Sequence, residues 1–140
     1  MKNRLITGIG AIISGLLIFI GPRTIFKLCE AKPDGSWMKC HWTGEAELGV
    51  GLLIVALGVL LLIFSSKRTR LGLSVAVAFA GIPVLLFPTV LIGGCMMKTM
   101  ACQSVTFPAL IVIGIITVIG FTFNSLFLLL SARNQREGNG

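Results

Sequence analysis

The sequence has little charge, and it lacks the polar residues that cover a soluble domain. Charged residues make up 12% of the 140 positions, five residues are acidic, one is histidine and none is tyrosine. In contrast, 55% of the residues are hydrophobic and the mean hydropathy is +0.96, outside the range of soluble domains. The chain is therefore predicted to lie in a lipid bilayer. Its net charge of +7 requires no nucleic-acid partner, because cations at helix ends interact with anionic lipid.

Long stretches of the chain contain no Asp, Glu, Lys, Arg or His. Four such stretches run from Leu5 to Pro22, Leu48 to Ser66, Leu71 to Met97 and Thr99 to Ala132. Each is as long as the roughly 18 apolar residues that cross a hydrocarbon core of about 30 Å. A proton relay or an ion pathway normally needs an ionisable group within a span. Transport by this chain alone is therefore not expected.

Strand-like alternation of polar and apolar residues is also absent, which leaves helices to satisfy every backbone group in lipid. We predict an all-α integral membrane protein: a four-helix transmembrane bundle made of two similar helical hairpins in a single domain, residues 1–140. The helices are expected near residues 5–21, 46–64, 71–91 and 107–131. Outer loops at 22–45 and 92–106 and an inner turn at 65–70 would join them.

The cations predict an orientation with both termini inside the cell. The inner ends would carry seven of the twelve Lys and Arg residues: Lys2, Arg4, Lys67, Arg68, Arg70, Arg133 and Arg136. Three of these fall within residues 65–70, and such a dense cluster resists translocation. We therefore expect a multi-pass protein of a bacterial-type plasma membrane, with the cysteine-bearing outer loops on the extracytoplasmic side.

The two halves of the chain show an internal repeat. In each half a proline precedes a cysteine by seven residues, and a Met-x-Cys segment follows. These positions are Pro22, Cys29 and Met38-Lys39-Cys40 in the first half, and Pro88, Cys95 and Met100-Ala101-Cys102 in the second. Small residues also recur every four positions, at Thr7, Ala11 and Gly15 and again at Gly72, Ala76 and Ala80. We call each of these rows of small residues a small-residue ladder. The two ladders predict that the first and third helices contact each other, related by a pseudo-twofold axis along the membrane normal.

All four cysteines, Cys29, Cys40, Cys95 and Cys102, fall in the expected outer loops. On an oxidising face of the membrane, two pairs of cysteines most simply indicate two disulfides. The repeat favours pairing within each hairpin, Cys29 with Cys40 and Cys95 with Cys102, although three connectivities are open. Disulfides of this kind would hold together short loops that have little core of their own.

A second interpretation of the same loops is a soft-metal site. Thiolates and thioethers prefer Cu(I), and imidazole is a borderline ligand. The candidate ligands are Met38, Cys40, His41, Cys95, Met96, Met100 and Cys102. Met96 and Met100 would share one face of a helical turn. Because metal ligands must be thiolates, a disulfide and a Cu(I)-thiolate site exclude each other.

A third interpretation is thiol-disulfide exchange. Four helices with a cysteine pair in each outer loop resemble the layout of the bacterial quinone-linked membrane proteins that generate disulfides. They are also similar, more loosely, to the vitamin K epoxide reductase family. That resemblance implies quinone as a cofactor. The reactive pair of those proteins is normally Cys-x-x-Cys, however, and here the paired cysteines are separated by ten and by six residues.

Four polar residues near or within the spans are given structural roles. Thr43 is a candidate N-cap of the second helix, which would place Glu45 and Glu47 in the first turn, where negative charge complements the helix dipole. Asn124 is the most polar residue within a span, and it is expected to form a hydrogen bond with a neighbouring helix.

The Met-x-Cys-His-Trp-Thr segment beginning at Met38, the Met100-Ala101-Cys102 segment and the following Pro108-Ala109-Leu110 resemble a prokaryotic family of small four-helix membrane proteins, domain of unknown function 4418. The resemblance implies fold and topology but no activity. It also suggests an ABC-type export permease as a partner. We therefore expect a non-enzymatic protein, an accessory subunit of a membrane complex or a Cu(I)-binding protein, that could form homo-oligomers. The alternative is a thiol-disulfide/quinone oxidoreductase.

Overall fold

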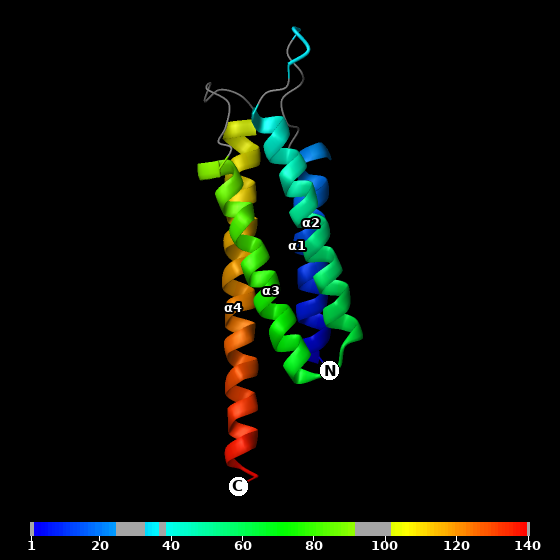
Figure 1. The fold of residues 1–140 in the computed structure, drawn as a ribbon, viewed down its shortest axis with the longest axis vertical. Coiled ribbons are helices and arrows are strands. Elements are labelled where there is room, and N and C mark those ends of the chain that lie inside the picture. The colour runs from blue at the N-terminus through cyan, green and yellow to red at the C-terminus, as the bar shows by residue number, and fades with distance from the viewer. Residues whose placement is uncertain (1, 25–32, 37–38, 92–101, 140) are drawn as a thin grey trace.

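The computed structural model describes residues 2–24, 33–36, 39–91 and 102–139, and nearly all of them are helical (Figure 1). The long helices are α1 (Lys2–Thr24), α2 (Lys39–Ile63), α3 (Lys67–Leu86) and α4 (Phe107–Glu137). Two π-helical turns adjoin them: η1 (Phe87–Leu91) extends α3, and η2 (Cys102–Thr106) precedes α4. All four long helices are long and apolar enough to cross a membrane, and the described ranges contain no strand. The predicted all-α transmembrane bundle is confirmed.

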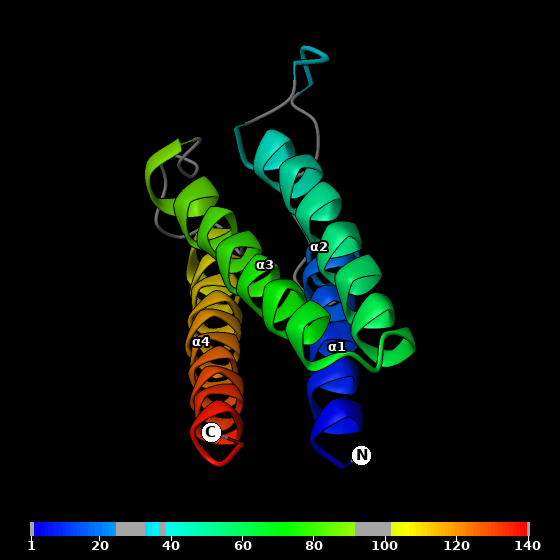
Figure 2. The same ribbon diagram turned by 60° about the horizontal axis from the view of Figure 1, so that its bottom comes forward.

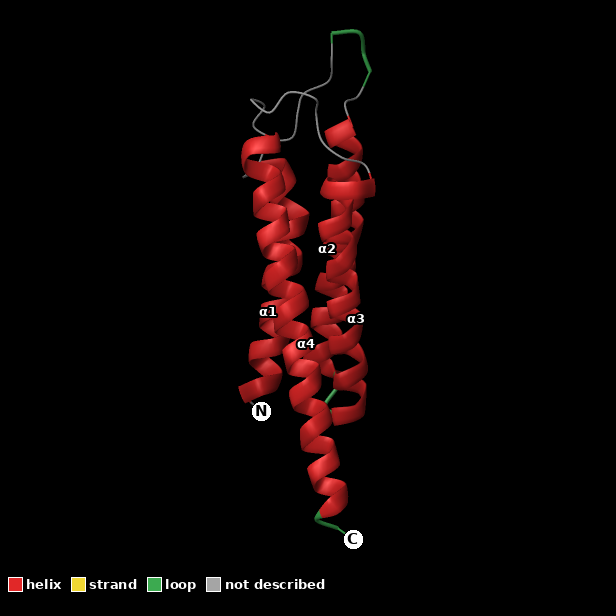
Figure 3. Ribbon diagram, turned by 90° about the vertical axis from the view of Figure 1, so that its left-hand side faces the viewer, coloured by secondary structure: helices red, strands yellow, loops and turns green. Residues whose placement is uncertain are grey.

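The bundle consists of two antiparallel hairpins, α1 with α2 and α3 with α4. The hairpins meet mainly where α2 packs against α3, and α4 contacts α1 to complete the ring. Both chain ends and the turn between α2 and α3 lie at one end of the bundle, which we call the inner end (Figures 1 and 2). The opposite end, where α1 ends and α2 begins, is the outer end. Figure 3 shows that α4 extends well beyond the other helices at the inner end.

Helix α2 begins earlier than the sequence suggested, at Lys39 and not near Ala46. Thr43 is therefore inside the helix, and no acidic residue lies in its first turn. The prediction of Thr43 as an N-cap, with Glu45 and Glu47 beside the helix end, is wrong. The segment is amphipathic, so one face of a helix can be buried while Trp42 and Glu45 on the other face stay exposed. A scan for charge-free stretches misses a helix of this kind.

The internal repeat is present in the packing of the helices. Buried residues of α3 lie 66 positions after buried residues of α1, and those of η2 and α4 lie 63 positions after those of α2. The matching pairs are Gly8/Ser74, Ala11/Val77, Gly15/Gly81 and Ile18/Val84 in the first helices, and Thr43/Thr106, Gly44/Phe107, Glu47/Leu110, Gly51/Gly114, Ile54/Thr117 and Gly58/Phe121 in the second. The two hairpins therefore bury the same faces of equivalent helices.

Equivalent glycines mark the crossing point of the helices in each hairpin. A Cβ on Gly15 would lie 2.7 Å from Val55 Cγ2, and a Cβ on Gly81 would lie 2.8 Å from Val118 Cγ2. Val55 and Val118 are themselves 63 positions apart, so the same contact occurs twice. Gly51 completes the first crossing, because a Cβ there would lie 2.8 Å from the backbone nitrogen of Phe19. The absence of a side chain at these positions allows the two backbones to approach closely.

The small-residue ladder of the first helix packs within its own hairpin. A Cβ on Gly58 of α2 would lie 2.9 Å from the Cβ of Ala11, and Gly15 faces the carbonyl oxygen of Gly51. Gly72 belongs to the supposed partner ladder, and no described atom lies within 4 Å of the position that a Cβ would take there. The predicted contact between the two ladders is therefore wrong. In a ring of four helices α1 and α3 are diagonal, so their close contacts are made with ring neighbours.

Asn124 forms the expected contact between helices. Its Nδ2 donates a hydrogen bond of 2.9 Å to Oγ of Ser74, which is fully buried in α3. The bond joins the two helices of the second hairpin at the level where the first hairpin has only apolar or small residues, Leu61 and Gly8. Buried polar groups in lipid need such partners, so the pair holds α3 and α4 in a single register.

Candidate functional site

The predicted site residues lie at the outer end of the bundle, as far as the structure describes them. His41 is described in full, and Cys40 and Cys102 are described by their backbone only. The other candidates lie outside the described residues: Cys29, Met38, Cys95, Met96 and Met100. Within the described ranges no three His, Cys, Asp or Glu residues are grouped as metal ligands. The disulfides and the Cu(I) site therefore stay predictions.

Cys40 and Cys102 begin equivalent helices of the two hairpins. Cys40 lies in the first turn of α2, and Cys102 is the first residue of η2, which continues into α4. The cysteines are 62 positions apart, whereas the buried residues of α2 and α4 are 63 apart. The π-helical turn accounts for this difference, because it holds one more residue than an α-helical turn. The Met-x-Cys repeat and the helix repeat are thus consistent with each other.

The rings of His41 and Trp42 contact each other at the outer end of the bundle. The two rings are T-shaped, with centroids 6.0 Å apart and an interplanar angle of 75°. Trp42 is 61% exposed, as expected of an aromatic residue at the headgroup level. His41 is half-buried, so its ring is partly covered at the point where α2 enters the bundle.

Glu47 is the most unusual residue of the outer end. Its side chain is fully buried, and neither carboxylate oxygen has a hydrogen-bond partner among the described residues. Two residues away, Glu45 behaves differently: it is exposed and forms an ion pair of 3.0 Å with Arg23 of α1. Arg23 of α1 is therefore paired with the surface carboxylate and not with Glu47. Burying a carboxyl group without a partner is costly, and within membrane helices such groups mark functional sites.

The repeat shows how Glu47 breaks the symmetry of the bundle. One turn toward the outer end, Thr43 and Thr106 are equivalent, and both are fully buried. At the next equivalent position α2 has Glu47 and α4 has Leu110, of which 1% is exposed. The position can thus be filled by an apolar side chain in this architecture. The carboxyl group is not required by the fold, which makes a functional role the better explanation for it.

Sequence reasoning missed the burial of Glu47, although a signal was available. Glu47 lies four residues after Thr43 and four before Gly51, with Ile54 three residues further, and this spacing defines one face of a helix. Extending the apolar stripe of α2 backwards would have placed Glu47 on the buried face. Because a charged residue was taken to mark the end of the membrane span, the position of Glu47 on the buried face of the helix was overlooked.

One comparison with known proteins identifies the family. The sequence profile described as Domain of unknown function (DUF4418) matches residues 11–128. The chain belongs to the DUF4418 family. No curated protein and no solved structure matches it. The part matched to DUF4418 begins in α1 and ends in α4, so it includes both hairpins, both Met-x-Cys segments and Glu47.

Proposed function

We propose that this DUF4418 protein binds Cu(I) at the outer end of its bundle and does not catalyse a reaction. The observation that carries the proposal is the buried carboxyl group of Glu47, which has no hydrogen-bond partner among the described residues. A monovalent cation bound nearby would favour the ionised form of this buried carboxyl group and balance its charge. Glu47 lies two turns, or about 10 Å, along α2 from Cys40, within the range over which charges interact strongly in a poorly solvated bundle.

The ligands in this proposal are thiols and thioethers of the two Met-x-Cys segments, with His41 as a borderline ligand. Cys40 and Cys102 begin equivalent helices at the same end of the bundle, which supports a site built from both hairpins (Figure 1). The carboxylate of Glu47 is a hard group that Cu(I) does not prefer as a ligand. Its role would be electrostatic.

The orientation follows from the distribution of cations. Lys67, Arg68 and Arg70 begin α3 at the inner end, where both termini also lie. From the positive-inside rule we propose that this end lies in the cytoplasm and that the cysteines lie on the extracytoplasmic side of the plasma membrane. Cysteines on that side can be oxidised to disulfides, so the Cu(I) proposal requires that they be kept reduced.

The test is anaerobic titration of the reduced, detergent-solubilised protein with Cu(I) against a chromophoric Cu(I) chelator. We expect about one tightly held copper ion per chain, lost when Cys40 and Cys102 are replaced by serine. Glu47→Gln should weaken the binding, and the matched control Glu45→Gln, on the exposed face of the same helix, should not. Absence of uptake by the reduced protein, or uptake unaffected by the cysteine changes, would refute the proposal.

The same preparation separates the alternatives. Two disulfides that resist reduction, with no copper uptake, would indicate that the cysteines have a structural role in holding the outer loops together. Disulfides that are reduced easily and reoxidised by added quinone would indicate the oxidoreductase. Wide cysteine spacing argues against the latter, because a reactive thiol needs a lowered pKa and the Cys-x-x-Cys motif that helps to lower it is missing.

A second candidate role is that of an accessory subunit in a membrane complex. Gly49 of α2 and Gly120 of α4 are exposed, and no described atom lies within 4 Å of the position that a Cβ would take at either. Exposed glycines allow another helix to approach closely, either from an ABC-type export permease or from a second copy of this chain. Native mass measurement after mild extraction tests this role. Gly120→Leu should release the partner, whereas the neighbouring exposed Ile119→Leu should not.

A further inference from the structure

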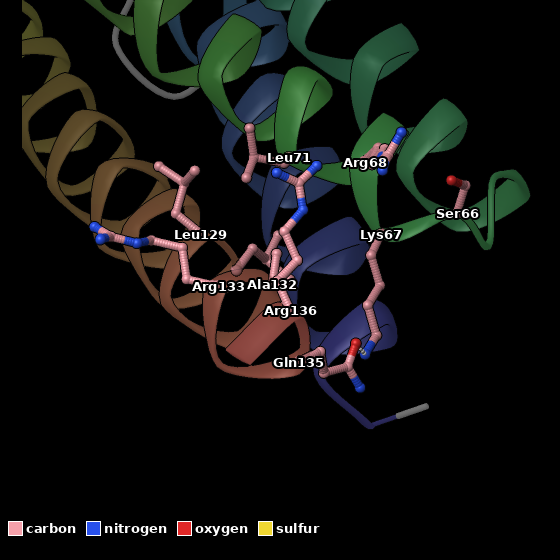
Figure 4. A pocket seen from close by; sticks show the side chains of 10 residues that line it. Ser66, Lys67, Arg68, Leu71, Leu129, Ala132, Arg133, Gln135 and Arg136 are labelled. Atoms are coloured by element: carbon pink, nitrogen blue, oxygen red, sulfur yellow. Dashed lines mark hydrogen bonds between the residues drawn. The ribbon is translucent and has the colours of Figure 1, made fainter. Parts of the chain in front are cut away.

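The inner end of the bundle contains a cavity of about 610 Å³ between the first turn of α3 and the last turns of α4 (Figure 4). It is lined by Ser66, Lys67, Arg68, Leu71, Leu128, Leu129, Ala132, Arg133, Gln135 and Arg136. We propose that this cavity binds the phosphate-bearing headgroup of one anionic phospholipid. This inference is independent of the proposed Cu(I) site, which lies at the opposite end of the bundle.

The charge of the cavity favours an anion. Four of its lining residues are cations, Lys67 and Arg68 from α3 and Arg133 and Arg136 from α4, and none is acidic. Figure 4 shows Arg136 of α4 extending toward Leu71 of α3, with Arg68 on the same side, whereas the Arg133 side chain points outward from α4. Arginine side chains present several donors in a planar fork that matches phosphate oxygens. Four cations from two helices would repel one another unless an anion lay between them.

The backbone at the start of α3 also favours phosphate. Ser66 is the N-cap residue, yet its side chain forms no capping hydrogen bond, and the first turn contains no acidic residue. The first backbone N–H groups of a helix lack partners within the helix, and they interact favourably with phosphate. Ser66 lines the cavity, so these groups lie beside the four cations.

The apolar part of the cavity distinguishes a lipid from a free anion. Leu128, Leu129 and Ala132 of α4 form an apolar wall, Leu71 of α3 also lines the cavity, and Leu129 is 44% exposed. This wall continues into the exposed apolar surface of α4, where Phe127 and Leu130 are 56% and 64% exposed. A molecule with a phosphate at one end and an acyl chain at the other fits both parts. Free phosphate would use only the charged part.

The level of the cavity relative to the hydrocarbon core agrees with the position of a lipid headgroup. Helix α4 has 31 residues, which corresponds to about 46 Å, whereas the hydrocarbon core is about 30 Å thick. Its last turns therefore lie beyond the core, at the level of lipid phosphates. Lys67 Nζ donates a hydrogen bond of 3.0 Å to Oε1 of Gln135, which joins the two walls at this level. Basic pockets between membrane helices at the cytoplasmic face are known to hold anionic headgroups.

Native mass spectrometry of the detergent-solubilised protein, incubated in turn with phosphatidylcholine, phosphatidylglycerol, cardiolipin or inorganic phosphate, tests the proposal. We expect one cardiolipin or phosphatidylglycerol to be retained per chain, in preference to phosphatidylcholine. The double substitution Arg68→Gln with Arg136→Gln should lower retention by about tenfold or more. Lys2→Gln, a cation of the inner end outside the cavity, is the matched control and should retain lipid as the unsubstituted protein does.

A second variant separates loss of lipid binding from misfolding of the doubly substituted protein. Arg133 is exposed, so Arg133→Gln should also reduce retention while thermal stability is unchanged. Equal retention of lipid by both variants and the control would overturn the proposal. So would equal retention of phosphatidylcholine, or binding of inorganic phosphate as tight as that of cardiolipin, which would indicate a site for a free anion.

Discussion

Glu47 of α2 and Leu110 of α4 occupy equivalent buried positions in the two hairpins, 63 residues apart, and only the first carries a carboxyl group. The threonines one turn away and the glycines at the helix crossings are identical in the two hairpins, and the other equivalent buried positions carry apolar, small or hydroxyl-bearing residues. The comparison therefore indicates that packing at this position needs only an apolar side chain. The carboxyl group of Glu47 serves another purpose.

Replacing Glu47 by Leu should stabilise the bundle. The change removes a buried carboxyl group that has no hydrogen-bond partner in the described structure, and it installs the residue used at the equivalent position. The expected gain in the free energy of unfolding is on the order of 1 to 3 kcal/mol, measured by thermal denaturation in detergent. The reverse substitution, Leu110→Glu, should destabilise by a similar amount. If Glu47→Leu lowers the stability, the carboxyl group has a structural partner and the functional argument fails.

The glycine crossings predict two opposite results on one helix. Gly51→Ala should lower the free energy of unfolding by about 1 to 3 kcal/mol, because its Cβ would meet the backbone of Phe19 at 2.8 Å. Gly49→Ala, two residues away, should be neutral or slightly stabilising, because its Cβ meets no described atom within 4 Å and alanine favours helices. Thermal stability in detergent measures both. Equal effects of the two changes would contradict the observed packing of α1 on α2.

The hydrogen bond between Asn124 and Ser74 should contribute measurably to the second hairpin. Asn124→Leu is expected to cost about 0.6 to 1.7 kcal/mol, the range found for hydrogen bonds between membrane helices. A double-mutant cycle with Ser74→Ala isolates the interaction. A coupling energy near zero would show that the two side chains do not interact in the membrane.

Accessibility to an impermeant thiol reagent should differ between the two ends of the bundle. In intact cells expressing a variant without the native cysteines, Asp34→Cys should be labelled, because exposed Asp34 lies in the connection at the outer end. Ser66→Cys, exposed in the turn between α2 and α3, should stay unlabelled until the membrane is permeabilised. The opposite pattern would reverse the orientation and remove the argument for an oxidising environment around the cysteines.

Several features of the protein were determined by the sequence alone. The length of the four charge-free runs dictates four membrane-spanning helices, because a hydrocarbon core has a fixed thickness and leaves no other partner for backbone groups. The repeated Met-x-Cys segments indicated two similar hairpins, and the isolated polarity of Asn124 indicated a hydrogen bond between helices. Each of these inferences needs only local composition and spacing.

The tertiary structure decided which faces of the helices meet. Diagonal and neighbouring helices of a ring carry the same small-residue spacing, so only the packing could show that Ala11 faces Gly58 and not α3. Glu47 is buried because α2 extends outward to Lys39, and the amphipathic register of that extension depends on the helices packed around it. The basic cavity forms because Arg68 and Arg136, far apart in the chain, line the same space where α3 begins and α4 extends beyond the other helices. Such pairings arise from contacts between distant segments, and no local pattern in the sequence specifies them.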